Sequence, residues 1–164
     1  MDSLYEFALL VKAGQRELER RTNEAMRPLG LTAVQADALA VIGQAGPLSL
    51  TELGRLLIAE AGHPSRLVDR LVEAGLVERR AGAGDRRQVE LSLTAKGREL
   101  ESRVEEARAS LFELARTLIG ERRVEPALDL LRHLTQYSSY ADLIARRREL
   151  AELDGEAETP KRFS

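Results

Sequence analysis

Residues 49–52 read Ser-Leu-Thr-Glu, residues 66–80 read Arg-Leu-Val-Asp-Arg-Leu-Val-Glu-Ala-Gly-Leu-Val-Glu-Arg-Arg, and residues 85–94 read Asp-Arg-Arg-Gln-Val-Glu-Leu-Ser-Leu-Thr. Apolar spacing predicts two short amphipathic helices, at 50–57 and 64–74. Period-two alternation then predicts two β-strands, at 76–80 and 88–93, joined by a glycine-rich loop that carries arginine. This order predicts a helix-turn-helix with a β-wing, which presents both a helix and a charged loop to DNA.

Composition is typical of one domain that needs no covalent staples. The chain has 164 residues, enough to bury a core, and it contains no cysteine, which excludes disulfides, thiolate metal sites and cysteine redox sensing. It shows neither a signal-peptide pattern nor the run of roughly 18 apolar residues that a membrane span needs. We therefore expect a soluble cytoplasmic protein with no membrane contact, no metal and no cofactor.

Charge is divided unevenly along the chain. The net charge is −2, but residues 62–98 carry 8 basic and 5 acidic side chains, a net charge of +3. The segments before and after them, 1–61 and 99–164, carry net charges of −2 and −3. The positive excess therefore falls on the predicted second helix and wing, where phosphates would lie.

Long helices flank this unit. Apolar residues recur every 3.5 positions over 3–27, and they do so again in a helix that begins after Thr94 and ends near Ile119. We expect a further helix from about Pro126 to Arg148 and a disordered tail at 154–164. The predicted organisation is one mostly α domain over 1–153, with a small β-wing, the winged helix-turn-helix at about 32–97 and dimerisation helices at 3–27 and 94–150.

The second helix is the candidate reading helix. Its inward face is marked by Leu67, Val68, Leu71 and Val72, which leaves Ser65, Arg66, Asp69, Arg70 and Glu73 facing outward, and Gly75 follows as its C-terminal cap. Arginine near the start of such a helix grips guanine with two hydrogen bonds, and serine bonds either base or phosphate. The wing tip, Asp85-Arg86-Arg87, is placed to enter the adjacent minor groove, with Asp85 holding a neighbouring arginine.

Three stretches resemble the MarR family of bacterial transcriptional regulators: Arg66–Leu71, Gly75–Arg79 and, most specifically, Asp85–Gly97 with its Asp-x-Arg wing and Leu-x-Leu-Thr-x-x-Gly motif. The resemblance covers about residues 3–148. It implies a homodimer on a palindromic operator, usually a repressor released by a small phenolic or anionic ligand. It also implies that Arg87 is the minor-groove arginine, that Asp85 steadies the wing, and that Ser65, Arg66 and Arg70 belong to the reading helix.

The turn before the reading helix departs from the family pattern. Ile58-Ala-Glu60 replaces the usual glycine-containing turn, and Gly62-His63-Pro64 stands where the helix normally has its first turn. Proline is unfavourable inside a helix but suits its first position. We therefore expect the helix to begin about two residues late, with His63 either capping it or contacting DNA.

An effector pocket, if present, is implied by the resemblance to lie between the dimer helices and the DNA lobe. Lys12, Gln15 and Arg16 on the first helix are candidates for binding a carboxylate or phenolate, although surface or helix-seam positions explain them as well. His133 and Tyr137 lie four residues apart, and we interpret them as interface packing because one histidine is a poor metal ligand set.

Two other functions compete with DNA reading. An enzyme is disfavoured because the chain has two histidines, no cysteine, no phosphate-binding glycine loop and no nucleophile motif. A winged helix used only for docking on a partner protein stays open, because a net charge of +3 over the unit is modest.

Overall fold

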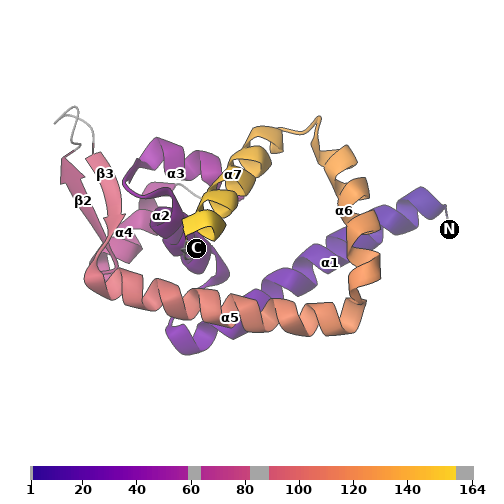
Figure 1. The fold of residues 1–164 in the computed structure, drawn as a ribbon, viewed down its shortest axis with the longest axis horizontal. Helices are drawn as coiled ribbons and strands as arrows, with labels where there is room; N and C mark the ends of the chain where they lie inside the picture. Colours follow the sequence, from indigo (N-terminus) through magenta and orange to yellow (C-terminus); the bar gives the residue numbers. More distant parts are fainter. Residues whose placement is uncertain (1, 59–63, 82–88, 158–164) are drawn as a thin grey trace, which may run out of the picture.

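The computed structural model describes residues 2–58, 64–81 and 89–157 (Figure 1). Its helices are α1 (Ser3–Met26), a short 3-10 helix (Arg27–Leu29), α2 (Ala33–Ala45), α3 (Leu50–Leu56), α4 (Pro64–Glu73), α5 (Ala95–Ile119), α6 (Glu121–Thr135) and α7 (Ala141–Ala157). An antiparallel sheet is formed by β1 (Leu48–Ser49), β2 (Val77–Ala81) and β3 (Val89–Leu93). The predicted class, mostly α with a small β-wing, is confirmed.

Local hydrogen bonds explain where α2 and α3 begin. The Gln35 amide donates to Thr32 Oγ1 (3.3 Å) while the Thr32 amide donates to Gln35 Oε1 (2.9 Å). Ser49 and Glu52 repeat the arrangement, with distances of 3.2 and 2.8 Å. Each pair satisfies two amides that would otherwise lack partners at the helix start, so both helices begin with a capping box.

The core lies where α2 is surrounded by α3, α4, the sheet and the first half of α5. Six elements contribute side chains that are at most 1% exposed, and these include Met26 at the end of α1, Leu39, Ile42, Leu53, Leu71, Leu91 and Val104. Burial of each such side chain contributes about 1.5–3 kcal/mol. The lobe that carries α4 and the wing is therefore held together within one chain.

The sheet contains a strand that sequence periodicity did not indicate. Its order is β1-β3-β2, with Leu48 opposite Leu91 and Ser49 opposite Glu90. β1 has only two residues, too few to show an alternating pattern. β1 pairs with β3 and thereby joins the segment between α2 and α3 to the wing, so β3 has a partner strand on each side.

The C-terminal region differs from the single helix expected at Pro126–Arg148. The structure has two helices, because α6 ends at Thr135 and α7 begins at Ala141. Ser138 Oγ donates to the Thr135 carbonyl (2.7 Å) and accepts from the Tyr140 amide (3.2 Å). A serine hydroxyl that bonds nearby backbone competes with the helix ladder, which accounts for the break.

Two boundaries in this region also move. Pro126 lies inside α6 rather than at its start, where its missing N–H removes a single helical hydrogen bond near the first turn. α7 reaches Ala157, four residues into the segment 154–164 that was expected to be a tail. Residues 158–164 lie outside the described part of the chain.

The elements form a lobe, which contains α2, α3, α4 and the sheet, and two arms, which are α1 and the consecutive helices α5 and α6 (Figure 1). α5 runs along one side of the molecule, from the wing at one end to α6 and the first half of α1 at the other. α7 then returns to lie beside α3. Within the described ranges, no helix is both long enough and apolar enough to span a bilayer.

The junction between α4 and α5 is the tightest contact that the glycines reveal. A Cβ built on Gly97 would stand 2.0 Å from the carbonyl oxygen of Leu76, which is backbone and has little freedom to move. The Thr94 amide donates to that same carbonyl (3.0 Å), and Thr94 Oγ1 donates to the Gly75 carbonyl (2.7 Å). The first turn of α5 therefore lies directly on the chain that leaves α4.

We expect Gly97→Ala to lower the free energy of unfolding by about 3 kcal/mol or more, because the added methyl group forces α5 away from Leu76. Urea denaturation followed by circular dichroism measures the loss. Gly14→Ala is the matched control, since nothing lies within 4 Å of its Cβ position. In mid-helix it should stabilise by up to about 1 kcal/mol. Equal effects of the two substitutions would contradict the tight junction.

Candidate nucleic-acid interface

α4 is anchored by one face and open on the other. Val68 and Leu71 are 0% and 1% exposed, and they fix the helix on the core. Arg66 and Arg70 are exposed, whereas Ser65 is half-buried. The structure therefore places the two arginines of the predicted reading helix at the surface, on a helix whose inner face is locked.

Small residues set where α4 lies. Pro64 is its first residue, and the proline ring approaches Gly54 of α3 so closely that a Cβ there would be 3.3 Å from Pro64 Cγ. At the other end Gly75 adopts a positive φ of 70°, and the Leu76 amide donates to the Leu71 carbonyl (2.9 Å). These bonds are those of a glycine C-cap, as predicted.

Lys96 adds a contact that sequence analysis did not anticipate. Its Nζ donates to the Ala74 carbonyl at the end of α4 (2.7 Å). A cation at this position is stabilised by the negative end of the helix dipole. Lys96 and Thr94 together close the C-terminus of α4 from the α5 side.

A salt bridge joins α4 to the wing. Asp69 Oδ1 lies 2.6 Å from Arg79 Nη2 on β2, and the two side chains are 49% and 40% exposed. Asp69 had been interpreted only as part of the outward face of α4. No local spacing signals the pair, because it depends on how β2 crosses α4. The bridge fixes the direction of the wing strand relative to the arginine-bearing helix.

The wing strands are described as far as Ala81 and from Val89 onward. Their register pairs Val77 with Leu93 and Ala81 with Val89. The tip residues Asp85, Arg86 and Arg87 fall in 82–88, and His63 falls in 59–63; both segments lie outside the described residues.

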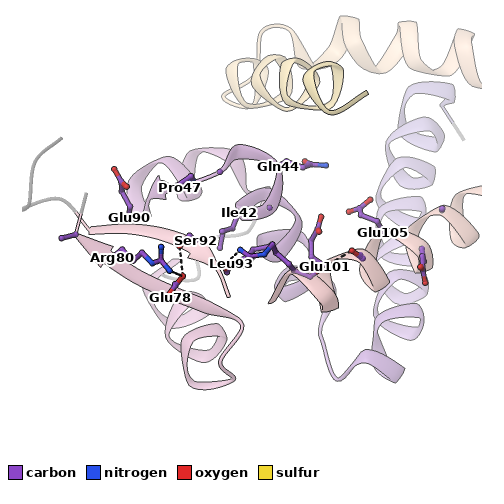
Figure 2. Close-up of a pocket in the computed structure, with 17 residues that line it drawn as sticks. Ile42, Gln44, Pro47, Glu78, Arg80, Glu90, Ser92, Leu93, Glu101 and Glu105 are labelled. Atoms are coloured by element: carbon purple, nitrogen blue, oxygen red, sulfur yellow. Dashed lines mark hydrogen bonds and ion pairs between the residues drawn. The ribbon is translucent and has the colours of Figure 1, made fainter. Parts of the chain in front are cut away.

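A groove away from the exposed face of α4 has the wrong charge for phosphate. It has a volume of about 1290 Å³ and runs between the end of α2, the strands β2 and β3, and the start of α5 (Figure 2). Its lining holds five carboxylates, from Glu78, Glu90, Glu101, Glu105 and Glu106. Of its two arginines, Arg80 pairs with Glu78 (2.6 Å) and Arg98 donates to the Leu93 carbonyl (2.8 Å). Nucleic acid is therefore expected on the α4 face and not in this groove.

The α1 candidates do not join this surface. Lys12, Gln15 and Arg16 are all exposed on α1, and Arg16 Nη1 bonds Glu19 Oε2 (3.2 Å). Figure 1 shows the first half of α1 at the opposite end of the molecule from the wing. On α6, the His133 ring is edge-on to Tyr137, with centroids 6.4 Å apart, and Tyr137 is 85% exposed.

Comparison with known proteins shows the family of the chain. The sequence description of the MarR family matches residues 31–89. A helix-turn-helix-type transcriptional regulator of Bacillus subtilis, YwoH, is 30% identical over 115 residues, which cover 70% of this chain and 81% of YwoH. The chain belongs to the MarR family. Relatives named as regulators and repressors agree with the expectation that it is not an enzyme.

Two further relatives come from Escherichia coli. The multiple antibiotic resistance protein MarR is 35% identical over 88 residues, which span 54% of this chain and 61% of MarR. A crystal structure of a cysteine-to-serine MarR mutant complexed with operator DNA has a TM-score of 0.71 and 27% identity, covering 82% of this chain and 99% of that one. The winged-helix fold of this MarR-family chain is thereby confirmed.

Loss of the Asp69–Arg79 bridge should loosen the wing without unfolding the lobe. Because both side chains are well exposed, we expect Asp69→Ala or Arg79→Ala to change the free energy of unfolding by less than about 1 kcal/mol. Hydrogen exchange at the β2 amides should nevertheless become faster in both variants, and no faster in the double variant. Arg80→Ala is the control, because Arg80 pairs within its own strand. Unchanged exchange in both single variants would show that the bridge does not hold the wing.

Proposed function

We propose that this chain binds double-stranded DNA in a sequence-specific manner as a homodimer and represses transcription until a small molecule releases it. The observation that carries the proposal is α4 itself. It exposes Arg66 and Arg70 on a helix held by Val68 and Leu71, beside a wing strand to which Asp69 is bridged. A MarR relative of the same fold has been crystallised with operator DNA, which supports the same use here.

The chemistry of recognition divides between helix and wing. A guanidinium at Arg66 or Arg70 is suited to the O6 and N7 acceptors of guanine in the major groove, and Ser65 to a base edge or phosphate. For Arg87 we propose the minor groove, with Arg86 on phosphate and Asp85 steadying the tip. His63 precedes α4 directly and is proposed to contact the adjacent phosphate or base edge.

The arginines of α4 and the arginine of the wing should differ in how they affect sequence specificity. We expect Arg66→Ala and Arg70→Ala each to reduce discrimination at particular base pairs by about 1–3 kcal/mol. Arg87→Ala should weaken binding to every duplex and lower the salt slope by about 1. Fluorescence anisotropy with a selected operator, its single-base variants and a random duplex at graded salt measures both effects.

Arg123→Ala, an exposed change on α6, is the matched control and should leave binding unaltered. Equal and sequence-blind losses for the arginines of α4 and the wing would contradict base reading by α4. A wing that docks on protein alone would retain no duplex even at low salt.

The dimer is proposed because α1, α5 and α6 expose many apolar side chains. In the described residues of α6, from Arg122 to Thr135, no side chain is buried. Exposed aliphatic side chains continue across α1, α5 and α6, with exposures of 44–76% for the set Leu4, Leu10, Val11, Leu114, Leu118, Leu130 and Leu134. α6 has 15 residues, and an isolated helix of that length is only marginally stable in water. A second copy of the chain that covers α1, α5 and α6 accounts for both observations.

A charge placed on this apolar surface should separate the protomers. We expect the protein to sediment as a dimer at micromolar concentration, and Leu130→Glu to raise the dimer dissociation constant about tenfold or more, since a buried carboxylate lacks a partner. Loss of helical circular dichroism should accompany dissociation, because α6 then lacks its packing. Arg122→Glu, on an exposed position of α6, is the control. A monomeric parent protein would overturn the dimer.

The remaining parts of the proposal follow from the dimer. Lys12, Gln15 and Arg16 would line a cleft only once a second copy faces α1, and two cations there suit a phenolate or carboxylate effector. Residues 32–97 would form the DNA lobe, and 3–27 with 94–135 the arms. A regulator that works on chromosomal DNA acts in the cytoplasm.

A further inference from the structure

α7 belongs to the DNA lobe although it follows the arms in sequence. It packs against α2 and α3, and α3 is the first helix of the helix-turn-helix. Leu143, Arg147 and Leu150 are spaced by four and three residues and so share one face of α7. Leu143 is 8% exposed and Leu150 packs on the main core. α7 therefore docks on the lobe through a defined face.

At the centre of this face three helices meet on one carboxylate. Asp37 Oδ1 of α2 accepts from Arg147 Nη2 of α7 (2.7 Å) and from Arg108 Nη2 of α5 (3.2 Å). The side chains are 30%, 27% and 17% exposed, so water and salt screen them less than they screen a pair on the open surface. The carboxylate ties α2 to both α5 and α7.

The geometry of Arg147 favours a positioning role over a stabilising one. Its Nη1 is buried and has no hydrogen-bond partner among the described residues. An unsatisfied buried donor offsets much of what the ion pair contributes to stability. The planar guanidinium still restricts how α7 lies on α2, because its Nη2 is held 2.7 Å from Asp37 Oδ1 while the rest of the group is fixed on the same rigid plane.

α7 also has a weaker, electrostatic interaction with α3. The Ser49 amide and hydroxyl hold the pKa of Glu52 below its usual value, and Arg146 of α7 adds a smaller electrostatic contribution of the same sign. Glu52 is the residue that closes the capping box of α3. α7 therefore packs on α2 and α3, and the charge of Arg146 acts on the residue that caps α3.

We propose that α7 is a strap that fixes the orientation of the DNA lobe relative to α5, with Arg147 and Asp37 as positioning residues for operator spacing. This inference rests on the proposed function, because lobe orientation matters when a dimer spans half-sites roughly 34 Å apart. The α4–α5 junction and the packing of α2 on the first half of α5 attach the lobe to its arm near the start of α5. The strap supplies the second attachment, through α6 and the break at 136–140.

The absence of cysteine from the chain makes a direct measurement possible. Thr51→Cys, at an exposed position of α3, adds one spin label per protomer and two per dimer. Pulsed dipolar spectroscopy then gives the distribution of lobe-to-lobe distances, which should be narrow. Arg147→Ala and Asp37→Asn should each broaden it, and the double variant should broaden it no further. Arg148→Ala, exposed on the same helix, is the matched control and should leave the distribution narrow.

DNA supplies a second readout that simple destabilisation does not move. The parent protein should prefer one half-site spacing over another that differs by a base pair. Arg147→Ala should lose that preference while its affinity for a single half-site is unchanged. If Arg147→Ala fails to fold in a thermal melt, Asp37→Asn carries both measurements.

The outcomes separate the two proposals. A broad distance distribution in the parent protein, or a narrow one in both variants, overturns the strap while the dimer and DNA binding stand. Absent dipolar coupling or absent DNA binding in the parent protein overturns the proposed function, and the strap with it.

Discussion

The contact between Gly97 and the Leu76 carbonyl is the constraint on which the rest of the structure depends. Leu76 ends the reading-helix segment and begins the wing, and Thr94 ends the wing and begins α5. Three elements therefore meet at a point with no room for a side chain. Because Thr94 and Lys96 also satisfy carbonyls at the end of α4, a displacement of α5 is transmitted to α4 and to both wing strands. An interior packed this closely does not deform gradually.

Charge is separated over the two sides of the sheet as it is along the chain. Arg66 and Arg70 are exposed on α4, whereas the groove on the α5 side is lined mainly by carboxylates. The net charge of −2 is thus compatible with binding a polyanion, because the field near α4 differs from the average. The acidic groove also disfavours approach of DNA from the opposite side, which leaves one face for recognition.

Elements governed by local bonds could be predicted from the sequence, and those governed by distant packing could not. The capping boxes at Thr32 and Ser49, the Gly75 cap and the span of α5 all follow from residues within four positions of one another. Residues far apart in sequence are joined by β1, by the Asp69–Arg79 salt bridge and by the ion pairs of Asp37 with Arg108 and Arg147. No sequence spacing predicts these contacts. The break at 136–140 was missed for another reason: the apolar period continues through it, while the serine that interrupts the helix is a common surface residue.

That break has a mechanical consequence. α6 has no buried side chain in its described residues and would take its packing from the second copy proposed above, whereas α7 buries Leu143 on the lobe of its own chain. A continuous helix from 121 to 157 could not serve both surfaces, because its direction would be fixed by one of them. The turn lets the chain leave the arm and return to α2, so that lobe, α5, α6 and α7 form a closed circuit (Figure 1). A lobe attached at two points of a circuit resists rotation about either one. A ligand that separated the arms would therefore also strain the contact of α7 with α2, which would couple the proposed effector cleft to the spacing of the two proposed reading helices.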